Sequence, residues 1–303
     1  MACGSAVPVR VGCHVSIAGS IDRAVERARE RGCDVFQIFT GNPRGWAAKE
    51  LAPDASAAFS TGVRAAGMDP VVAHMPYLPN LASPKKEVYK KSVAVMIREL
   101  DRCTALGIPY LVTHLGSHLG SGASGGIARL VDGISRALAE SRGTVTVLLE
   151  NTAGTAHSVG GTFEEIREVL DGIGSPDQVG VCFDTCHAWA AGYDLSGRDE
   201  VAETLRDFDS AVGCADLRVV HVNDCKGARG SHLDRHEHVG LGAIGEDGFR
   251  AFLAHPAVRA CPLICETPVD ARRSDADNIS RVRELANPCS NGRKGSRHGK
   301  KGD

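Results

Sequence analysis

Eight short apolar runs, rich in Val, Ile and Leu, recur along the chain and alternate with longer segments of helical periodicity. Nearly continuous apolar runs are typical of strands that are buried on both faces of a parallel sheet. Eight strand–helix alternations predict an α/β fold, a closed (β/α)8 TIM barrel, with an open doubly wound sheet as the alternative. The predicted strands are Val9–Val15, Asp34–Phe39, Pro70–His74, Pro109–His114, Thr144–Glu150, Val179–Asp184, Leu217–Val222 and Pro262–Glu266.

The predicted barrel accounts for most of the chain. Such barrels typically take about 250 residues as one domain, and the chain has 303. We predict a short N-terminal extension at residues 1–8, a catalytic barrel domain at residues 9–286 and a basic, disordered tail at residues 287–303. The tail has almost no apolar side chain to bury. We expect a solvated end, although its charge can add weak affinity for a polyanion.

Two of the intervening segments carry helix-boundary signals. Ser83 followed by Pro84 predicts an N-cap and a proline in the first helical position, with Gly107 at the other end of that helix. Thr162 and Glu165 have the spacing of a capping box. Both signals fall between predicted strands, as the barrel requires.

Cysteine content and net charge bear on the cellular compartment and on how the protein could contact nucleic acid. Eleven cysteines are an odd number in a long chain, and the sequence does not start with an apolar signal segment. We therefore expect reduced thiols in an intracellular protein, cytoplasmic or nucleoid-associated, and a monomer. No apolar stretch approaches the roughly 20 residues of a membrane span. The formal net charge of −2 gives no global basic field, so contact with nucleic acid would need a local patch.

Side chains that bind metals stand at or next to the C-terminal ends of six consecutive predicted strands. In a parallel barrel these ends meet on one face, where barrel enzymes place their active sites. Two loop segments, Asp184-Thr-Cys-His187 and Asp234-Arg-His236, add further candidates. The nine candidate metal ligands are His74, His114, Glu150, Asp184, His187, His221, Asp234, His236 and Glu266.

This set combines histidines and carboxylates without a thiolate. Crowded carboxylates repel one another and are costly to desolvate unless divalent cations neutralise them. Imidazole and carboxylate ligands favour zinc or manganese. Any single member could be a hydrogen-bonded packing residue, but six strand ends on one face favour a metal centre. His14, on the first strand, could either support a ligand or pack in the core.

Several segments that contain these residues closely resemble endonuclease IV, a family of zinc-dependent apurinic/apyrimidinic endonucleases. The resemblance covers all but the two ends of the chain. Departures from the family pattern, such as Gly45 and Met75, lie in loops and bear on damage preference rather than on metal binding. The matching segments are Gly12-Cys-His-Val-Ser16, Phe39-Thr-Gly-Asn-Pro-Arg44, His74-Met-Pro-Tyr-Leu78, His114-Leu-Gly-Ser-His118, Glu150-Asn-Thr-Ala-Gly154, Asp184-Thr-Cys-His187, His221-Val-Asn-Asp224, Asp234-Arg-His236 and Glu266-Thr-Pro268.

The resemblance implies a centre of three zinc ions, with manganese possible at one of them. Glu150 would bridge the first and second metals. All nine ligand positions carry the residue type that the family pattern requires. The implied groups are His74, His114 and Glu150 for the first metal; Glu150, Asp184, His221 and Glu266 for the second; and His187, Asp234 and His236 for the third.

The resemblance also implies a function in DNA repair. A zinc-activated hydroxide would hydrolyse the phosphodiester bond 5′ to an abasic site in duplex DNA, leaving a 3′-hydroxyl and a 5′-deoxyribose phosphate. Glu150 and Glu266 would orient the nucleophile as well as bind metal. The candidate DNA contacts are Arg44, Tyr77 and Leu78, which by resemblance enter the minor groove, and the loop cations Lys226, Arg229 and Arg235.

Two alternatives remain open at the level of sequence. A metal-dependent sugar isomerase or epimerase uses a similar barrel with His, Asp and Glu at strand ends, but it usually needs only one or two metals. A non-catalytic protein could use the same face to bind abasic DNA without cutting it. The number of bound metals tests the first alternative, and incubation with an abasic duplex tests the second.

Overall fold

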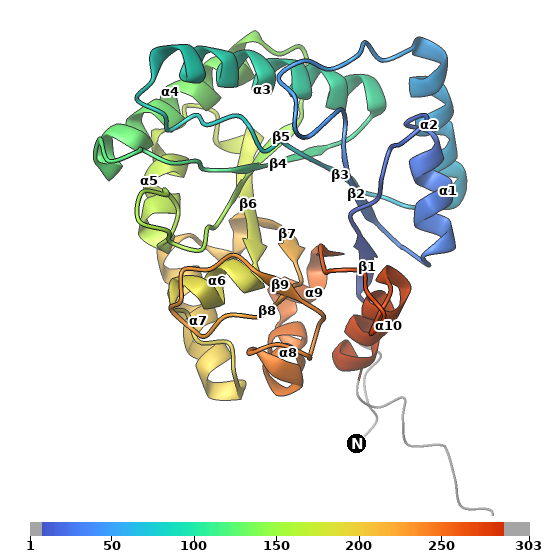
Figure 1. The fold of residues 1–303 in the computed structure, drawn as a ribbon, viewed down its shortest axis with the longest axis vertical. Coiled ribbons are helices and arrows are strands. Elements are labelled where there is room, and N and C mark those ends of the chain that lie inside the picture. Colours follow the sequence, from blue (N-terminus) through green and yellow to red (C-terminus); the bar gives the residue numbers. More distant parts are fainter. Residues whose placement is uncertain (1–7, 288–303) are drawn as a thin grey trace, which may run out of the picture.

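The computed structural model describes residues 8–287, which form a barrel of eight parallel strands surrounded by helices (Figure 1). The strand order is β1-β10-β7-β6-β5-β4-β3-β2, and all seven ladders are parallel. The eight strands predicted from apolar runs are therefore confirmed. Their bounds are β1 (Arg10–Cys13), β2 (Phe36–Phe39), β3 (Val71–His74), β4 (Tyr110–His114), β5 (Thr146–Glu150), β6 (Val179–Asp184), β7 (Leu217–His221) and β10 (Pro262–Cys265).

Helices cover the outside of the barrel, and one short hairpin stands apart from it. The hairpin pairs β8 (Asp224–Cys225) with β9 (His236–Glu237) in antiparallel register and follows β7. The hairpin was not predicted, because each of its strands is only two residues long. The helices are α1 (Arg23–Glu30), α2 (Pro53–Ala66), α3 (Lys86–Leu106), α4 (Ala123–Glu140), α5 (Phe163–Gly172), α6 (Thr185–Ala191), α7 (Arg198–Ala211), α8 (Gly245–Ala254), α9 (Pro256–Ala260) and α10 (Asp275–Ala286).

Both faces of the sheet are buried, which explains why the strand sequences are apolar almost throughout. The larger apolar cluster fills the space between the sheet and the helices. A smaller apolar cluster fills the inside of the barrel. One residue comes from, or directly precedes, each strand from β2 round the sheet to β10. This inner cluster consists of Val35, Val72, Val112, Leu148, Cys182, Val219 and Ile264, all fully buried.

The barrel closes between β1 and β2, the one pair of neighbouring strands that is not joined by a ladder of backbone hydrogen bonds in the described structure. These two strands share one isolated parallel bridge, between His14 and Gln37, in place of a continuous ladder. The amide of Val15 donates to the carbonyl of Gln37 at 2.8 Å. Gly12 permits the close approach, because a Cβ there would stand 1.6 Å from the carbonyl oxygen of Val35. A side chain at this position would push the two strands apart.

The predicted helix boundaries are partly confirmed. Gly107 ends α3 in the left-handed region, at a φ of 70°, and the Thr162 side chain accepts a hydrogen bond from the Glu165 amide at the start of α5. The Glu165 carboxylate, however, binds the amides of Gly160 and Gly161, so the reciprocal half of the capping box is absent. The start of α3 was predicted wrongly.

Helix α3 begins at Lys86, after an extended Lys85, and not at Pro84 as predicted. The buried Ser83 hydroxyl accepts a hydrogen bond from the Lys85 amide, which turns the chain before the helix starts. A local side-chain hydrogen bond has replaced the expected N-cap.

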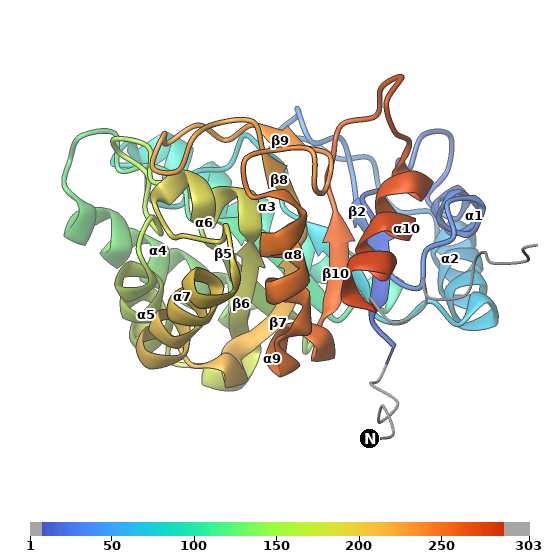
Figure 2. The ribbon, with the colours of Figure 1, turned by 90° about the horizontal axis from the view of Figure 1, so that it is seen from below.

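The loops after the strands gather on one side of the molecule, next to the β8–β9 hairpin (Figure 2). The predicted N-terminal extension and basic tail lie outside the described residues, apart from residues 8 and 287. Within the described chain, no helix is both long enough and apolar enough to cross a membrane.

Candidate metal centre

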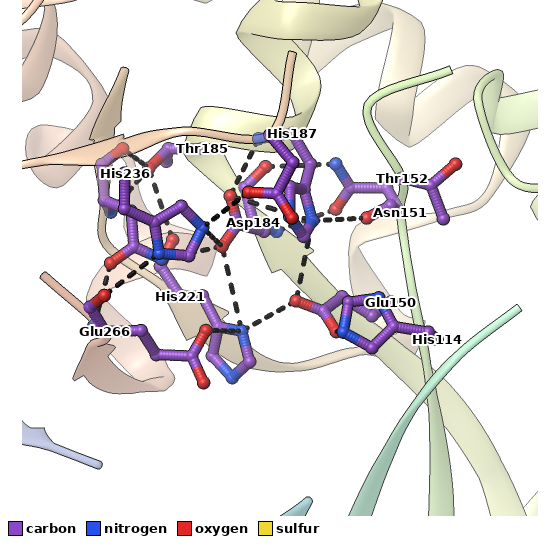
Figure 3. Close-up of polar contacts among 12 residues, drawn as sticks. His114, Glu150, Asn151, Thr152, Asp184, Thr185, His187, His221, His236 and Glu266 are labelled. Atoms are coloured by element: carbon purple, nitrogen blue, oxygen red, sulfur yellow. Dashed lines mark hydrogen bonds and ion pairs between the residues drawn. The ribbon is translucent and has the colours of Figure 1, made fainter. Parts of the chain in front are cut away.

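The structure brings the nine predicted ligands together at the C-terminal ends of the strands. Figure 3 shows how His114, Glu150, Asp184, His187, His221, His236 and Glu266 lie around one centre. They form three groups, and within each group the potential ligand atoms lie within 4.8 Å of one another. The groups have the same membership as those implied by resemblance: His74, His114 and Glu150; Glu150, Asp184, His221 and Glu266; and His187, Asp234 and His236.

Glu150 connects the first two groups with its two carboxylate oxygens. Its Oε2 lies 3.1 Å from His74 Nε2 and 3.6 Å from His114 Nε2. Its Oε1 lies 2.9 Å from His221 Nδ1 and 3.6 Å from His187 Nδ1. One oxygen therefore faces the first group and the other faces the second, which is the arrangement that a bridging carboxylate needs.

The second group has buried ligand atoms, and its edge at Glu266 borders a cavity. His221 Nδ1 lies 3.3 Å from Glu266 Oε2 and 3.8 Å from Asp184 Oδ2. Asp184 and His221 are fully buried, whereas 19% of the Glu266 side chain is exposed. Glu266 is thus the carboxylate of this group that a substrate or a water molecule can reach.

The third group is more open to solvent. His187 Nε2 and His236 Nε2 each lie 3.3 Å from an oxygen of Asp234, whose side chain is 51% exposed. His236 Nε2 is buried and makes no hydrogen bond. Cys186 also lies near Asp184 and His236, but burial and the neighbouring Cys225 raise the pKa of its thiol, with the Cys225 hydrogen bond as the largest cause.

The hydrogen bonds of the histidines fit metal binding. His74 Nδ1 lies 2.7 Å from the Met75 carbonyl, His187 Nδ1 2.9 Å from the Asn151 carbonyl, and His236 Nδ1 3.0 Å from the Glu266 carbonyl. A carbonyl oxygen only accepts, so each Nδ1 carries a proton, and Nε2 is the nitrogen that faces the site and can bind a metal once it is deprotonated. Metal-binding histidines are fixed by such bonds to their second nitrogen. His236 Nε2, which faces Asp234 and Asp184 but makes no hydrogen bond, fits this arrangement.

The charges of the centre are balanced by histidines alone. Among residues 8–287, Glu150, Asp184 and Glu266 form ion pairs only with histidine side chains. Burial would raise the pKa of Glu150, yet the surrounding histidines hold it well below its usual value. Burial would lower the pKa of His187, but Asp184, Asp234 and Glu150 raise it well above its usual value. Cations are expected to take the place of these protons.

Sequence reasoning missed three side-chain amides that make hydrogen bonds to the candidate ligands. Asn151 makes two hydrogen bonds to the Asp184 backbone, at 2.7 and 3.0 Å. Asn223 donates to Asp184 Oδ2 at 2.7 Å and accepts from the Glu266 amide at 2.8 Å. Gln37 is buried in β2 and contacts both Glu266 and His221. The available signal was position: Asn151 directly follows a ligand, and Gln37 interrupts an apolar strand.

The predicted DNA contacts lie in loops around the centre and are all exposed. Tyr77 and Leu78, exposed by 59% and 40%, line a cavity of about 430 Å³ beside His114 and His187. Arg44 stands in the loop after β2. Arg229 is paired with Asp194, and Arg235 donates to the carbonyl of its neighbour. These positions are compatible with a partner that covers the centre.

Comparison with known proteins places this centre in a family. Residues 25–287 match the family described as xylose isomerase-like TIM barrel. The chain is 61% identical to probable endonuclease 4 of Methanoculleus marisnigri over 279 residues, which are 92% of this chain and 99% of the relative. The chain belongs to the endonuclease IV family. A second relative, probable endonuclease 4 of Methanosphaerula palustris, is 52% identical and also covers 92% of the chain.

Solved structures agree with membership of the endonuclease IV family. Endonuclease IV from Thermus thermophilus superimposes with a TM-score of 0.81 at 37% identity, covering 91% of this chain and 98% of that one. A D-tagatose 3-epimerase-like protein superimposes with a TM-score of 0.65 at 20% identity, over 92% of this chain and 98% of that protein. The second likeness shows a shared fold only. The sugar epimerase alternative therefore gains no support beyond the barrel itself.

Proposed function

We propose that this endonuclease IV family member is a DNA repair enzyme that cuts duplex DNA at abasic sites. It hydrolyses the phosphodiester bond 5′ to the abasic sugar and leaves a 3′-hydroxyl and a 5′-deoxyribose phosphate. The observation that carries the proposal is the set of three adjacent donor groups, two of which share Glu150, beside a cavity that Glu266, His187 and Asp234 line. Two or more metals around one phosphate suit phosphodiester hydrolysis, whereas a sugar isomerase leaves the third group unexplained.

The nine predicted ligands would hold three zinc ions, with manganese possible at one position. Bound there, the ions supply Lewis acidity for phosphate oxygens and lower the pKa of water towards about 7. Glu150, buried between two groups, fixes the spacing of the ligand sets. Glu266 borders the second cavity, of about 430 Å³, together with His14 and His236. Its exposed edge suits it to orient the attacking water.

Recognition of damage is assigned to the exposed loops. All six large hydrophobic side chains that are exposed among residues 8–287 lie in loops that follow strands, on the side of the metal centre. An abasic nucleotide has no base to unstack, so it leaves the duplex at lower cost than a normal nucleotide. Tyr77 and Leu78 would fill the resulting gap, and the loop cations would contact phosphates. The exposed hydrophobic residues are Tyr77, Leu78, Leu119, Leu233, Leu241 and Val269.

The decisive experiment is incubation of the purified protein with a duplex that contains one abasic analogue. We expect a single cut on the 5′ side of the lesion, a 3′ end that a polymerase extends, and no cut after treatment with a chelator. An undamaged duplex of the same sequence is the control. Binding without cutting in the presence of zinc would support the non-catalytic alternative instead.

Metal analysis tests the same proposal independently of DNA. Three donor groups predict about three zinc ions per chain. A single metal ion after gentle purification would contradict the three-metal centre and would reopen the isomerase alternative.

A further inference from the structure

Gln37 is a fully buried polar side chain in the middle of strand β2, between Phe36 and Ile38. A buried amide costs free energy unless its hydrogen bonds are made. The Gln37 Nε2 donates to Glu266 Oε1 at 2.6 Å and lies 3.0 Å from His14 Nδ1. Its Oε1 lies 2.9 Å from His221 Nε2. The amide is therefore satisfied by groups that belong to, or border, the candidate metal centre.

The contact with His221 determines which ring nitrogen faces the centre. The amide oxygen of Gln37 only accepts, so the proton of His221 stands on Nε2. Its Nδ1 is then the nitrogen that faces Glu150 and Glu266, at 2.9 and 3.3 Å, and that can bind a metal once it is deprotonated. Three other candidate ligands, His74, His187 and His236, are held through Nδ1, whereas His221 is held through Nε2.

The contact with Glu266 requires a donor. A carboxylate at position 37 would repel Glu266, and an apolar side chain would leave both the Glu266 oxygen and the His221 N–H without this partner. An amide both donates and accepts from one rigid group, which suits a position between a carboxylate and an imidazole.

Gln37 also lies where the barrel is least firmly closed. Its backbone forms the isolated bridge to His14 that joins β2 to β1. Its side chain crosses the same boundary and reaches Glu266, directly after β10, and His221, the last residue of β7. The hydrogen bonds of one residue thus connect β2 with ligands that come from two strands on the other side of the closure.

We propose that Gln37 is a positioning residue of the metal centre, which fixes the ring orientation of His221 and the carboxylate of Glu266 across the β1–β2 closure. This inference rests on the proposed role of His221 and Glu266 as ligands of the second metal. Gln37 would act through these two side chains, which it contacts directly.

The test compares zinc binding of the wild type with that of Gln37→Met, which keeps the length of the side chain but makes neither hydrogen bond. Loss of such a supporting contact typically lowers metal affinity by about 10–100-fold. We expect a loss of that size in a competition titration with a chromophoric chelator, and an altered absorption spectrum with Co²⁺ in place of Zn²⁺. A purely structural role would leave the spectrum unchanged.

Gln178→Met is the matched control, because Gln178 is the only other glutamine in the sequence. It stands before β6, at the opposite end of the barrel, and its side chain makes one long contact, 3.5 Å to the Gly143 carbonyl. Wild-type zinc affinity and Co²⁺ spectrum in Gln37→Met would overturn the inference. Failure of the wild type itself to bind zinc would instead contradict the proposed function.

If Gln37→Met does not fold, the ¹⁵N spectrum of the histidines in the zinc-loaded wild type replaces the titration. The inference requires the proton of His221 on Nε2. Signals from the tautomer protonated on Nδ1 are expected for His74, His187 and His236. Such a signal assigned to His221 would overturn the inference.

Discussion

Two regions of the molecule differ in burial and in side-chain hydrogen bonding. One is the set of strand ends with the candidate ligands, and the other is the set of loops with the candidate DNA contacts. His74, Glu150, Asp184 and His221 are almost entirely buried, and each has a fixed hydrogen-bond partner. In contrast, Tyr77 is 59% exposed. The ligand groups are therefore preorganised by the protein, whereas the loops have contact area that is left for a partner.

The loop after β2 shows how the two regions are joined. Its backbone is held from α3, because Arg98 donates to the Trp46 carbonyl at 2.7 Å and Arg102 donates to the Lys49 carbonyl at 2.8 Å. Glu99, fully buried, pairs with Arg98. The Arg44 side chain in the same loop is exposed. A rigid backbone with a free side chain can meet DNA without first ordering the loop.

The largest effect is expected inside the preorganised region, from Glu266→Gln. The change keeps the shape of the side chain but removes a negative charge, so the attacking water loses its orienting carboxylate. Misplacement of a reacting group by about 1 Å can cost on the order of a hundredfold in rate. We expect at least that loss in single-turnover cutting, with most of the zinc and the affinity for abasic duplex retained. Cutting at the wild-type rate would remove Glu266 from the mechanism.

Zinc binding should weaken as the pH falls, because protons compete for the same nitrogens. Burial would lower the pKa of His221 and of His74, but the carboxylates around the two rings, Glu150 and Glu266, and for His221 also Cys182, raise it above its usual value. Below that raised pKa each ring is protonated in the metal-free protein. Zinc must then displace the proton, and each displaced proton makes the apparent affinity fall about tenfold per pH unit.

Calorimetric zinc titrations of the metal-free protein at pH 6 to 8, in buffers of different ionisation enthalpy, measure this proton release. Burial lowers the pKa of His114, so we expect this ring to release less of a proton on zinc binding than His74 or His221. A zinc affinity that does not change with pH would contradict the expected competition.

In the exposed region, replacement of both Tyr77 and Leu78 by Ala should weaken binding without disturbing the metals. Stacking of a base on an aromatic side chain is typically worth about 1–3 kcal/mol, so we expect affinity for abasic duplex to fall about tenfold or more. Zinc content should stay at the wild-type level. Leu241→Ala, at a second exposed apolar loop position, gives a single-site comparison. Unchanged affinity of the double variant would return Tyr77 and Leu78 to a packing role at the rim.

The sequence predicted the structure most reliably where continuous apolar runs mark strands that are buried on both faces of a sheet. Apolar runs marked all eight strands. Side chains at or next to the ends of six of these runs fall into groups that could hold a metal, because parallel strands end on one face. It failed where the outcome depends on single hydrogen bonds between distant segments. Nothing near Gln37 in the sequence points to Glu266, which is 229 residues away. The misplaced start of α3 has the same cause, a hydrogen bond of Ser83 that competes with capping.

The smallest effect is expected from removal of residues 288–303, outside both regions of the comparison. The cut leaves Asn287 in place, whose Nδ2 donates to the Arg283 carbonyl at 3.2 Å and whose Oδ1 accepts from Arg259 at 3.2 Å, so the end of α10 keeps its contacts. The removed segment carries five Lys or Arg residues, and their attraction to DNA is screened by salt. We expect the unfolding temperature and the cutting rate at moderate salt to stay at wild-type values, with some loss of affinity at low salt. A large loss of cutting at moderate salt would mean that DNA binding depends on cations outside the loops. The tail would then count as part of the DNA-binding region, together with the recognition loops.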